Sequence, residues 1–572
     1  MPMQMPDAVS WLLFALTIAV ILLTDRFPDR TPSAPAERTH RAVCLIALAA
    51  GIAVRLLRLS SLPAGPTAEE AMAAVQAKSL LQTGGFFGTG AFAAQLPQWD
   101  GQTAGPLLSI LTAPFVALFG MKAAAVRLPL ALVSCASLPA AYGAGEAFAG
   151  RRGARWLLLV AAASPIFCLT ARLTAAECLS LPLLLIGLCF ALRAPRRPAL
   201  AFPACAAFGL LSWTEDLYFF LSPALIAAFA AFLLFARTDG GRKNGAAPAA
   251  LSAAAIGLLL CLPGILTACA SRANGADLRL GFVICPHLEN RYTAGGLPAE
   301  MASSLHPDRT LFTKLWAVLG GGLFQIAMHE TIGQGYFLPA GMTALYLFAV
   351  PLALLGAVSG LSAFLAGKRN AAAGLSALLG VVTLAAEVLY GSSGMLVAGG
   401  TTSVWDGMQM FPYTALLAAA GLLRMEKRSR AGFVYALAVY GASFGMLAFW
   451  LFGGGYAGAA NVSFADYAAA AERAGEIREA RGLPVAATSR VHPHGSPEEA
   501  ARMLLLYAMD ADMRTAAADP DAYGEIIWPG SMEEPPAGEV CLVAAQDSRG
   551  WYWDEEEWDC ETFGRYILLI PK

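Results

Sequence analysis

Long apolar runs separated by short polar stretches dominate the chain between residues 10 and 450. A run of about 16 to 25 apolar residues has the length of a helix that crosses a bilayer. Runs of this kind lie at residues 10–24, 41–57, 127–148, 155–170, 178–192, 199–212, 217–235, 251–270, 338–365, 371–390, 408–423 and 432–450. Inside lipid every backbone N–H and C=O must be paired within the segment, so such runs form helices. The pattern predicts a mainly α, polytopic membrane protein with about 12 transmembrane helices.

The composition supports a membrane protein and argues against a soluble one. Hydrophobic residues make up 57% of the chain and charged residues only 14%, which is outside the usual range of soluble globular domains. The chain carries no basic stripe or nucleic-acid-binding motif. We therefore expect membrane lipids as its surroundings and no nucleic acid among its partners.

The polar pattern changes after residue 452, where the chain becomes less apolar and more acidic. An amphipathic helix is expected at 464–481, followed by a strand at 484–489, a helix at 497–509 and strands at 539–545 and 565–570. This alternation predicts one small α/β domain. Cys541 and Cys560 are the cysteines of this polar region, and we expect a disulfide between them if the domain faces an oxidising compartment.

Basic clusters between the apolar runs set the expected sidedness, because Lys and Arg are enriched in cytoplasmic loops. The clusters lie at residues 26–41, 151–155, 193–197, 237–243, 368–369 and 424–430. All six face the cytoplasm only if the apolar stretch 105–120, which is short and contains two prolines, does not cross the membrane. Both termini and the longer loops then lie outside, in the plasma membrane of a bacterium.

The expected organisation has three parts. Residues 1–40 form an additional N-terminal transmembrane helix and a basic cytoplasmic loop, and residues 41–452 form the transmembrane domain, with external loops 60–104 and 271–337. Residues 453–572 form the extracytoplasmic α/β domain.

Ionisable residues gather at the outer ends of the expected spans. They are Glu69, Glu70, Asp100, Arg172, Glu177, Glu215, Asp216, Arg272, Arg279, His287, Arg291 and Asp406. An ionised side chain near the hydrocarbon costs up to about 3 kcal/mol, so such residues usually line a wet cavity or a site. Each one alone can equally be a loop residue that reaches into the lipid headgroups.

Four strings in this region resemble one known family. They are "AEEAMAAVQAKSLLQTGG", "GPLLSILTAPFVALFGMKAAAVRLPLAL", "SPIFCLTARLTAAECLSLPLLL" and "GFVICPHLENRYT", which follow one another between residues 53 and 293. In order and spacing they are similar to motifs of the GT-C fold membrane glycosyltransferases, and within that class to bacterial relatives of the protein O-mannosyltransferases and the lipid A aminoarabinose transferases. The second half of the chain resembles the family in hydropathy only.

The resemblance implies transfer of a sugar from a polyprenyl-phosphate donor to an extracytoplasmic acceptor, which is a cell-envelope glycan, a lipid or a protein. It places Glu69 at the position of the family's acceptor-activating carboxylate, with Glu70 beside it and Glu177 at a further catalytic carboxylate. Glu69 and Glu177 stand where the family has Asp, and a base displaced by about 1 Å loses rate. Thr67 can also cap a helix whose first turn favours acidic residues, so an ordinary stabilising role for the pair stays open.

The leaving phosphate requires cations, for which planar arginines suit best. The external candidates for binding the donor phosphate are Arg172, Arg272 and Arg291, with His287 close to Arg291 in sequence. A Mg²⁺ or Mn²⁺ ion held by Glu69 and Glu177 is compatible with the carboxylates.

Two other functions remain open at this point. One is a catalytically inactive GT-C homologue with a binding or scaffold role, which the Glu-for-Asp differences favour. The other is a twelve-helix transporter, although such proteins with two six-helix halves usually keep both termini inside.

Overall fold

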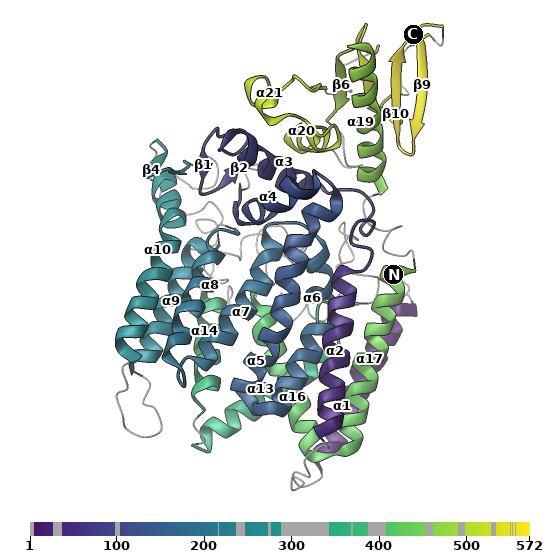
Figure 1. The fold of residues 1–572 in the computed structure, drawn as a ribbon. Coiled ribbons are helices and arrows are strands. Elements are labelled where there is room, and N and C mark those ends of the chain that lie inside the picture. Colours follow the sequence, from purple (N-terminus) through teal and green to yellow (C-terminus); the bar gives the residue numbers. More distant parts are fainter. Residues whose placement is uncertain are drawn as a thin grey trace, which may run out of the picture.

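The computed structural model describes most of the chain and arranges it as a helical bundle with a small mixed domain at one end (Figure 1). The described residues are 5–26, 37–97, 103–215, 217–235, 246–272, 276–287, 342–367, 370–386, 408–453, 462–489, 498–527, 534–548, 551, 553–554 and 556–572.

A helix forms in each of the twelve apolar runs. These helices are α1 (Met5–Asp25), α2 (Glu37–Leu56), α5 (Ala123–Ala163, which covers two runs), α7 (Ser180–Arg193), α8 (Ala201–Leu211), α9 (Tyr218–Phe235), α10 (Ala246–Arg272), α13 (Ala349–Leu365), α14 (Ala371–Ala386), α16 (Phe411–Arg428) and α17 (Arg430–Phe452). Five of the described helices, α2, α5, α9, α10 and α17, are long and apolar enough to cross a membrane. The structure thus supports a polytopic membrane protein, whereas the number of twelve crossings stays a prediction.

Helix α5 is two antiparallel helices joined by a sharp turn. Ala149 and Gly150 leave the helical conformation, and Gly150 has a φ of +73°, a conformation that glycine adopts without steric cost. The basic residues 151–155 directly follow this turn. The turn therefore lies at the end of the bundle where the sequence predicts the cytoplasm.

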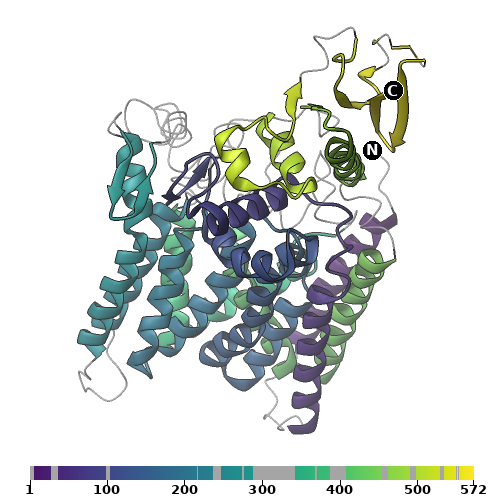
Figure 2. The same cartoon turned by 45° about the horizontal axis from the view of Figure 1, so that its top comes forward.

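Helices α3 (Ala68–Thr83) and α4 (Leu107–Phe119) lie against each other at the opposite end of the bundle, under the C-terminal domain (Figures 1 and 2). The 13 residues of α4 rise only about 20 Å, less than the hydrocarbon thickness of a bilayer. This position agrees with the expectation that residues 105–120 do not cross.

Loops at this end of the bundle add two small sheets next to these helices. Strand β1 (Phe92–Ala93) pairs in parallel with β5 (Val283–Cys285), which pairs with β4 (Leu278–Leu280), while β2 (Leu96–Pro97) pairs with β3 (Thr103–Ala104). Short turns connect the bundle helices on the same side: α6 (Pro165–Leu169), η2 (Thr170–Arg172) and η3 (Glu177–Leu179), whereas η4 (Pro198–Leu200) joins α7 to α8 at the other end. The two expected external loops, 60–104 and 271–337, therefore meet through β1 and β5.

The C-terminal domain is the expected α/β unit. Its helices are α19 (Val462–Arg481), α20 (Glu498–Ala508) and α21 (Met513–Ala518), and its strands are β6 (Val485–Thr488), β7 (Glu525–Ile527), β8 (Val540–Ala544), β9 (Trp558–Phe563) and β10 (Tyr566–Pro571). The strands form one mixed sheet in the order β7-β6-β8-β10-β9. The sequence analysis anticipated α19, α20, β6, β8 and β10, but not the short β7 and α21.

The expected disulfide between Cys541 and Cys560 is wrong. Both thiols are free, and the two residues pair with opposite edges of the same residue, Leu569 of β10. Two strand spacings place their Cα atoms about 10 Å apart, whereas a disulfide requires less than about 7 Å. An intervening strand therefore keeps the two cysteines apart.

Candidate functional site

Helix α3 begins with a reciprocal cap that fixes the second of the two adjacent glutamates. The Glu70 N–H donates to Thr67 Oγ1 at 3.0 Å, and the Thr67 N–H donates to Glu70 Oε2 at 3.2 Å. This capping box satisfies backbone donors that a helix start otherwise leaves unpaired. The ordinary capping role considered from the sequence is therefore real for Glu70.

A buried ion pair holds the same carboxylate against the bundle. Arg127 in α5 donates from Nε to Glu70 Oε1 at 2.9 Å and from Nη2 to Oε2 at 2.8 Å, and both side chains are inaccessible to solvent. Its remaining N–H groups bond the carbonyls of Leu59, Pro63 and Gly65. All five guanidinium donors are thus used. Arg127 fastens both the start of α3 and the loop before it to α5.

Glu69 differs from Glu70 in that it is not paired with Arg127 and is less completely buried. Its side chain is only partly buried, and desolvation raises its pKa, opposed by hydrogen bonds from its own backbone and Thr67 and reinforced by the Glu70 charge. A carboxylate with a raised pKa is a better proton acceptor, which is the property expected of a general base. The rigid attachment of Glu70 sets the position of its neighbour.

Glu177 and Glu215 come to the same place as Glu69. The charges of Glu177, Glu69 and Glu215 all act on the buried thiol of Cys178. Because charge interactions weaken with distance, these carboxylates lie around one thiol. The structure therefore gathers two predicted site residues and adds Glu215.

Backbone contacts explain how the three carboxylates meet. The Thr174 N–H donates to Glu70 Oε1 at 3.4 Å, which ties the segment before Glu177 to the start of α3. The Gly105 N–H bonds the Thr214 carbonyl at 2.9 Å, which brings the loop of Glu215 to the start of α4. A Cβ on Gly105 would overlap the backbone of Trp213. Only glycine allows this approach. In the sequence the only sign of this requirement is that Gly105 precedes a proline.

Arg172 does not face this group, contrary to the expected phosphate-binding role. Its buried guanidinium donates to the carbonyls of Val54, Leu57, Arg58 and Leu62. These include carbonyls from the end of α2, which have no partner within the helix. The structure thus gives Arg172 the role of capping α2 from the neighbouring turn.

The other predicted phosphate ligands are placed only in part. The His287 N–H donates to Asp277 at 2.8 Å, and its Nδ1 lies 3.1 Å from the Ala270 carbonyl, so the ring packs on the end of α10. Arg272 is the last residue of α10, and its side chain is not described. Arg291 lies outside the described residues. These phosphate-binding assignments remain proposals.

The sequence analysis expected a divalent cation at Glu69 and Glu177. Within the described ranges, no group of three or more His, Cys, Asp and Glu side chains is arranged to hold a metal ion. The Glu70 carboxylate is already engaged by Arg127 and the capping box. The cation at Glu69 and Glu177 therefore stays a prediction.

The C-terminal domain covers α3 from outside, which the sequence did not indicate. Lys78 of α3 donates to the Asp510 carboxylate at 2.7 Å and to its carbonyl at 2.8 Å. The Met513 N–H donates to the Gln82 side chain at 2.7 Å. Burial raises the pKa of Tyr507, and the Glu70 charge raises it further. This α20 residue therefore lies near the buried ion pair. The domain therefore closes the outer side of the helix that carries the glutamates.

Comparison with solved structures identifies the fold. ArnT from Cupriavidus metallidurans bound to undecaprenyl phosphate is 11% identical, with a TM-score of 0.50, over 94% of this chain and 98% of that chain. An Archaeoglobus fulgidus oligosaccharyltransferase tethered with an acceptor peptide is 12% identical, with a TM-score of 0.47, over 83% of this chain and 64% of that chain. This chain thus spans less than two thirds of the oligosaccharyltransferase.

No family model matches the sequence, and no curated protein matches it. At these identities the structural likeness concerns the fold. The chain has the fold of the GT-C membrane glycosyltransferases, as its motifs predicted.

Proposed function

We propose that this protein is a membrane glycosyltransferase that moves a sugar from a polyprenyl-phosphate donor to an extracytoplasmic acceptor in the bacterial plasma membrane. The observation that carries the proposal is the contrast between Glu69 and Glu70. Glu70 is immobilised by Arg127, whereas Glu69 is only partly buried and has a raised pKa among further carboxylates. A rigid support beside a reactive group is what a positioned base requires. The ArnT structure with undecaprenyl phosphate supports the donor class.

In the proposed reaction Glu69 removes the proton from an acceptor hydroxyl while the acceptor oxygen attacks the anomeric carbon of the sugar. The bond between that carbon and the donor phosphate oxygen breaks, and the electron pair leaves with the phosphate. The proton ends on Glu69 and passes to solvent. Attack opposite the leaving group inverts the anomeric configuration.

Two groups assist this transfer in our proposal. Glu177 orients the acceptor from the same carboxylate group, and Arg291, together with Arg272 and His287, balances the charge of the leaving phosphate. Arginine suits that role because its planar guanidinium can donate two parallel hydrogen bonds to phosphate oxygens.

The test is replacement of Glu69 in cells whose own copy of the gene is deleted. Mass spectrometry of the envelope glycans, lipids and proteins first identifies the sugar mass that deletion removes. Glu69→Gln should fail to restore this mass, whereas Glu69→Asp, which keeps a carboxylate, should restore part of it. Glu499→Gln, which changes an exposed glutamate of α20, is the matched control and should restore it fully.

Restoration of the full sugar mass by Glu69→Gln would reject the catalytic proposal. The chain would then act as an inactive GT-C homologue with a binding or scaffold role, the alternative that its Glu-for-Asp differences favour. Membrane abundance of each variant must match the wild type, so that loss of transfer is not loss of the protein.

A further inference from the structure

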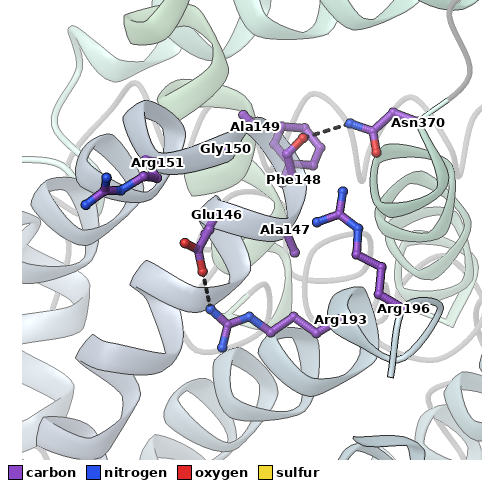
Figure 3. A pocket seen from close by; sticks show the side chains of 9 residues that line it. All are labelled: Glu146, Ala147, Phe148, Ala149, Gly150, Arg151, Arg193, Arg196 and Asn370. Atoms are coloured by element: carbon purple, nitrogen blue, oxygen red, sulfur yellow. Dashed lines mark hydrogen bonds and ion pairs between the residues drawn. The ribbon is translucent and has the colours of Figure 1, made fainter. Parts of the chain in front are cut away.

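A pocket of about 360 Å³ lies at the turn of α5, far from Glu69 and Glu177 (Figure 3). Its walls come from the turn itself, the end of α7 and the start of α14, with Glu146, Gly150, Arg193, Arg196 and Asn370 among the lining residues. Helix α5 rises about 1.5 Å per residue, so its 19-residue span from Arg127 to Glu146 covers ~29 Å, close to the thickness of the bilayer hydrocarbon. The pocket therefore lies one membrane thickness away from the proposed catalytic group.

The walls of this pocket are fixed by hydrogen bonds. The Asn370 amide donates to the Phe148 carbonyl at 2.9 Å, and its Oδ1 accepts from the Ala372 N–H at 3.0 Å at the start of α14. Asn370 thus joins the end of the first half of α5 to α14. Gly150, with its positive φ, allows the chain to reverse there. The pocket is part of the folded bundle and not a gap between loose side chains.

The charges of the pocket leave one arginine without a carboxylate. Arg193 pairs with Glu146 at 2.6 Å, and Arg151 reaches away from the pocket to pair with Glu37 at 2.9 Å. Among the described residues, Arg196 makes no ion pair, and Figure 3 shows its guanidinium directed toward the α5 turn. The pocket therefore has an excess of positive charge next to an open space.

We propose that this pocket binds a phosphate group, that of an anionic lipid headgroup, through Arg196 and Arg193. Basic pockets between transmembrane helices on the cytoplasmic side are suited to anionic headgroups, and arginine pairs with phosphate through two parallel hydrogen bonds. The volume lies within the range of small-molecule pockets, about 300 to 1,000 Å³. Free phosphate in the cytoplasm presents the same chemistry. The inference does not depend on the proposed transferase activity.

Native mass spectrometry of the full chain, released from detergent, tests the proposal. The probes are phosphatidylglycerol, phosphatidylcholine as the zwitterionic reference, and inorganic phosphate. Wild-type protein should retain phosphatidylglycerol in preference to phosphatidylcholine. Arg196→Gln should weaken phosphatidylglycerol binding about tenfold, the size expected for loss of a charge-assisted contact. Arg197→Gln is the matched control, because Arg197 is the adjacent exposed arginine and does not line the pocket.

A second variant changes affinity in the opposite direction and so separates binding from misfolding. Glu146→Gln removes the carboxylate that occupies Arg193, and it should tighten phosphatidylglycerol binding severalfold. If only inorganic phosphate binding depends on Arg196, the pocket takes phosphate from the cytoplasm and the phosphate site stands. The proposal is overturned if Arg196→Gln and Arg197→Gln both bind phosphatidylglycerol and inorganic phosphate like the wild type. It is also overturned if the two variants weaken this binding equally.

Discussion

Breaking the buried pair of Glu70 and Arg127 should destabilise the protein strongly. Glu70→Gln removes the negative charge but keeps the side-chain shape, and it leaves a guanidinium that is fully inaccessible to solvent. Removing one partner of a buried ion pair typically costs about 3 to 5 kcal/mol, because the remaining charge stays desolvated. We expect a loss of this size in the free energy of unfolding.

Arg127→Met should cost at least as much as Glu70→Gln. It strands the Glu70 carboxylate and also the three carbonyls of Leu59, Pro63 and Gly65 that Arg127 now serves, and each unpaired buried acceptor costs about 1 to 3 kcal/mol. Because both substitutions break the same pair, the double variant should cost less than the sum of the two single variants.

Unfolding by SDS titration in mixed micelles, followed by tryptophan fluorescence, measures these differences. Glu561→Gln is the control, because it breaks a pair with Arg473 in which more than a third of each side chain is exposed. Exposed pairs contribute little to stability, so this variant should unfold like the wild type. A Glu70→Gln variant within about 1 kcal/mol of the wild type, or strictly additive losses in the double variant, would refute the reasoning.

Three further predictions concern the glutamate pair, the domain contact and the cysteines. Burial raises the pKa of Glu69 in the folded state, so its ionisation destabilises the protein as pH rises through that pKa. Glu69→Gln should therefore unfold at a higher SDS fraction than the wild type at neutral pH. This gain in stability should vanish under acidic conditions, where Glu69 is protonated in both states. Gly65→Ala should loosen the C-terminal domain and so speed its proteolysis, because a Cβ at this positive φ would lie 2.6 Å from the backbone of Ala465. Gly88→Ala is the control: it has a similar φ but open space around it, and it should leave proteolysis of the domain unchanged. Cys560 is exposed, whereas burial raises the pKa of Cys541 to about 12. Of these two cysteines, mass analysis should therefore show maleimide only on Cys560, with or without a reductant. A mass gain of two hydrogens when this pair is reduced would contradict the sheet register.

The sequence by itself determined the helices and the type of fold. Residues in lipid or in an apolar core must pair their backbone within a helix, so apolar length alone located the twelve helical runs. The local motif around Thr67 likewise indicated a capped helix start, because a capping box involves residues only three positions apart. The ordered motifs were sufficient to recognise the GT-C fold, which the comparison with ArnT supports.

Only the tertiary structure decided which ionisable residues are engaged within the fold and which remain accessible. Arg172 follows one expected span and Arg127 begins another, but their guanidinium groups are buried on carbonyls and a carboxylate contributed by distant segments. Likewise, one intervening strand separates Cys541 from Cys560. Hydropathy indicates where a residue lies relative to the membrane. The partner of a charged side chain depends instead on packing between segments more than 50 positions apart. That packing separates Glu70, which is buried on Arg127, from Glu69, which stays partly exposed.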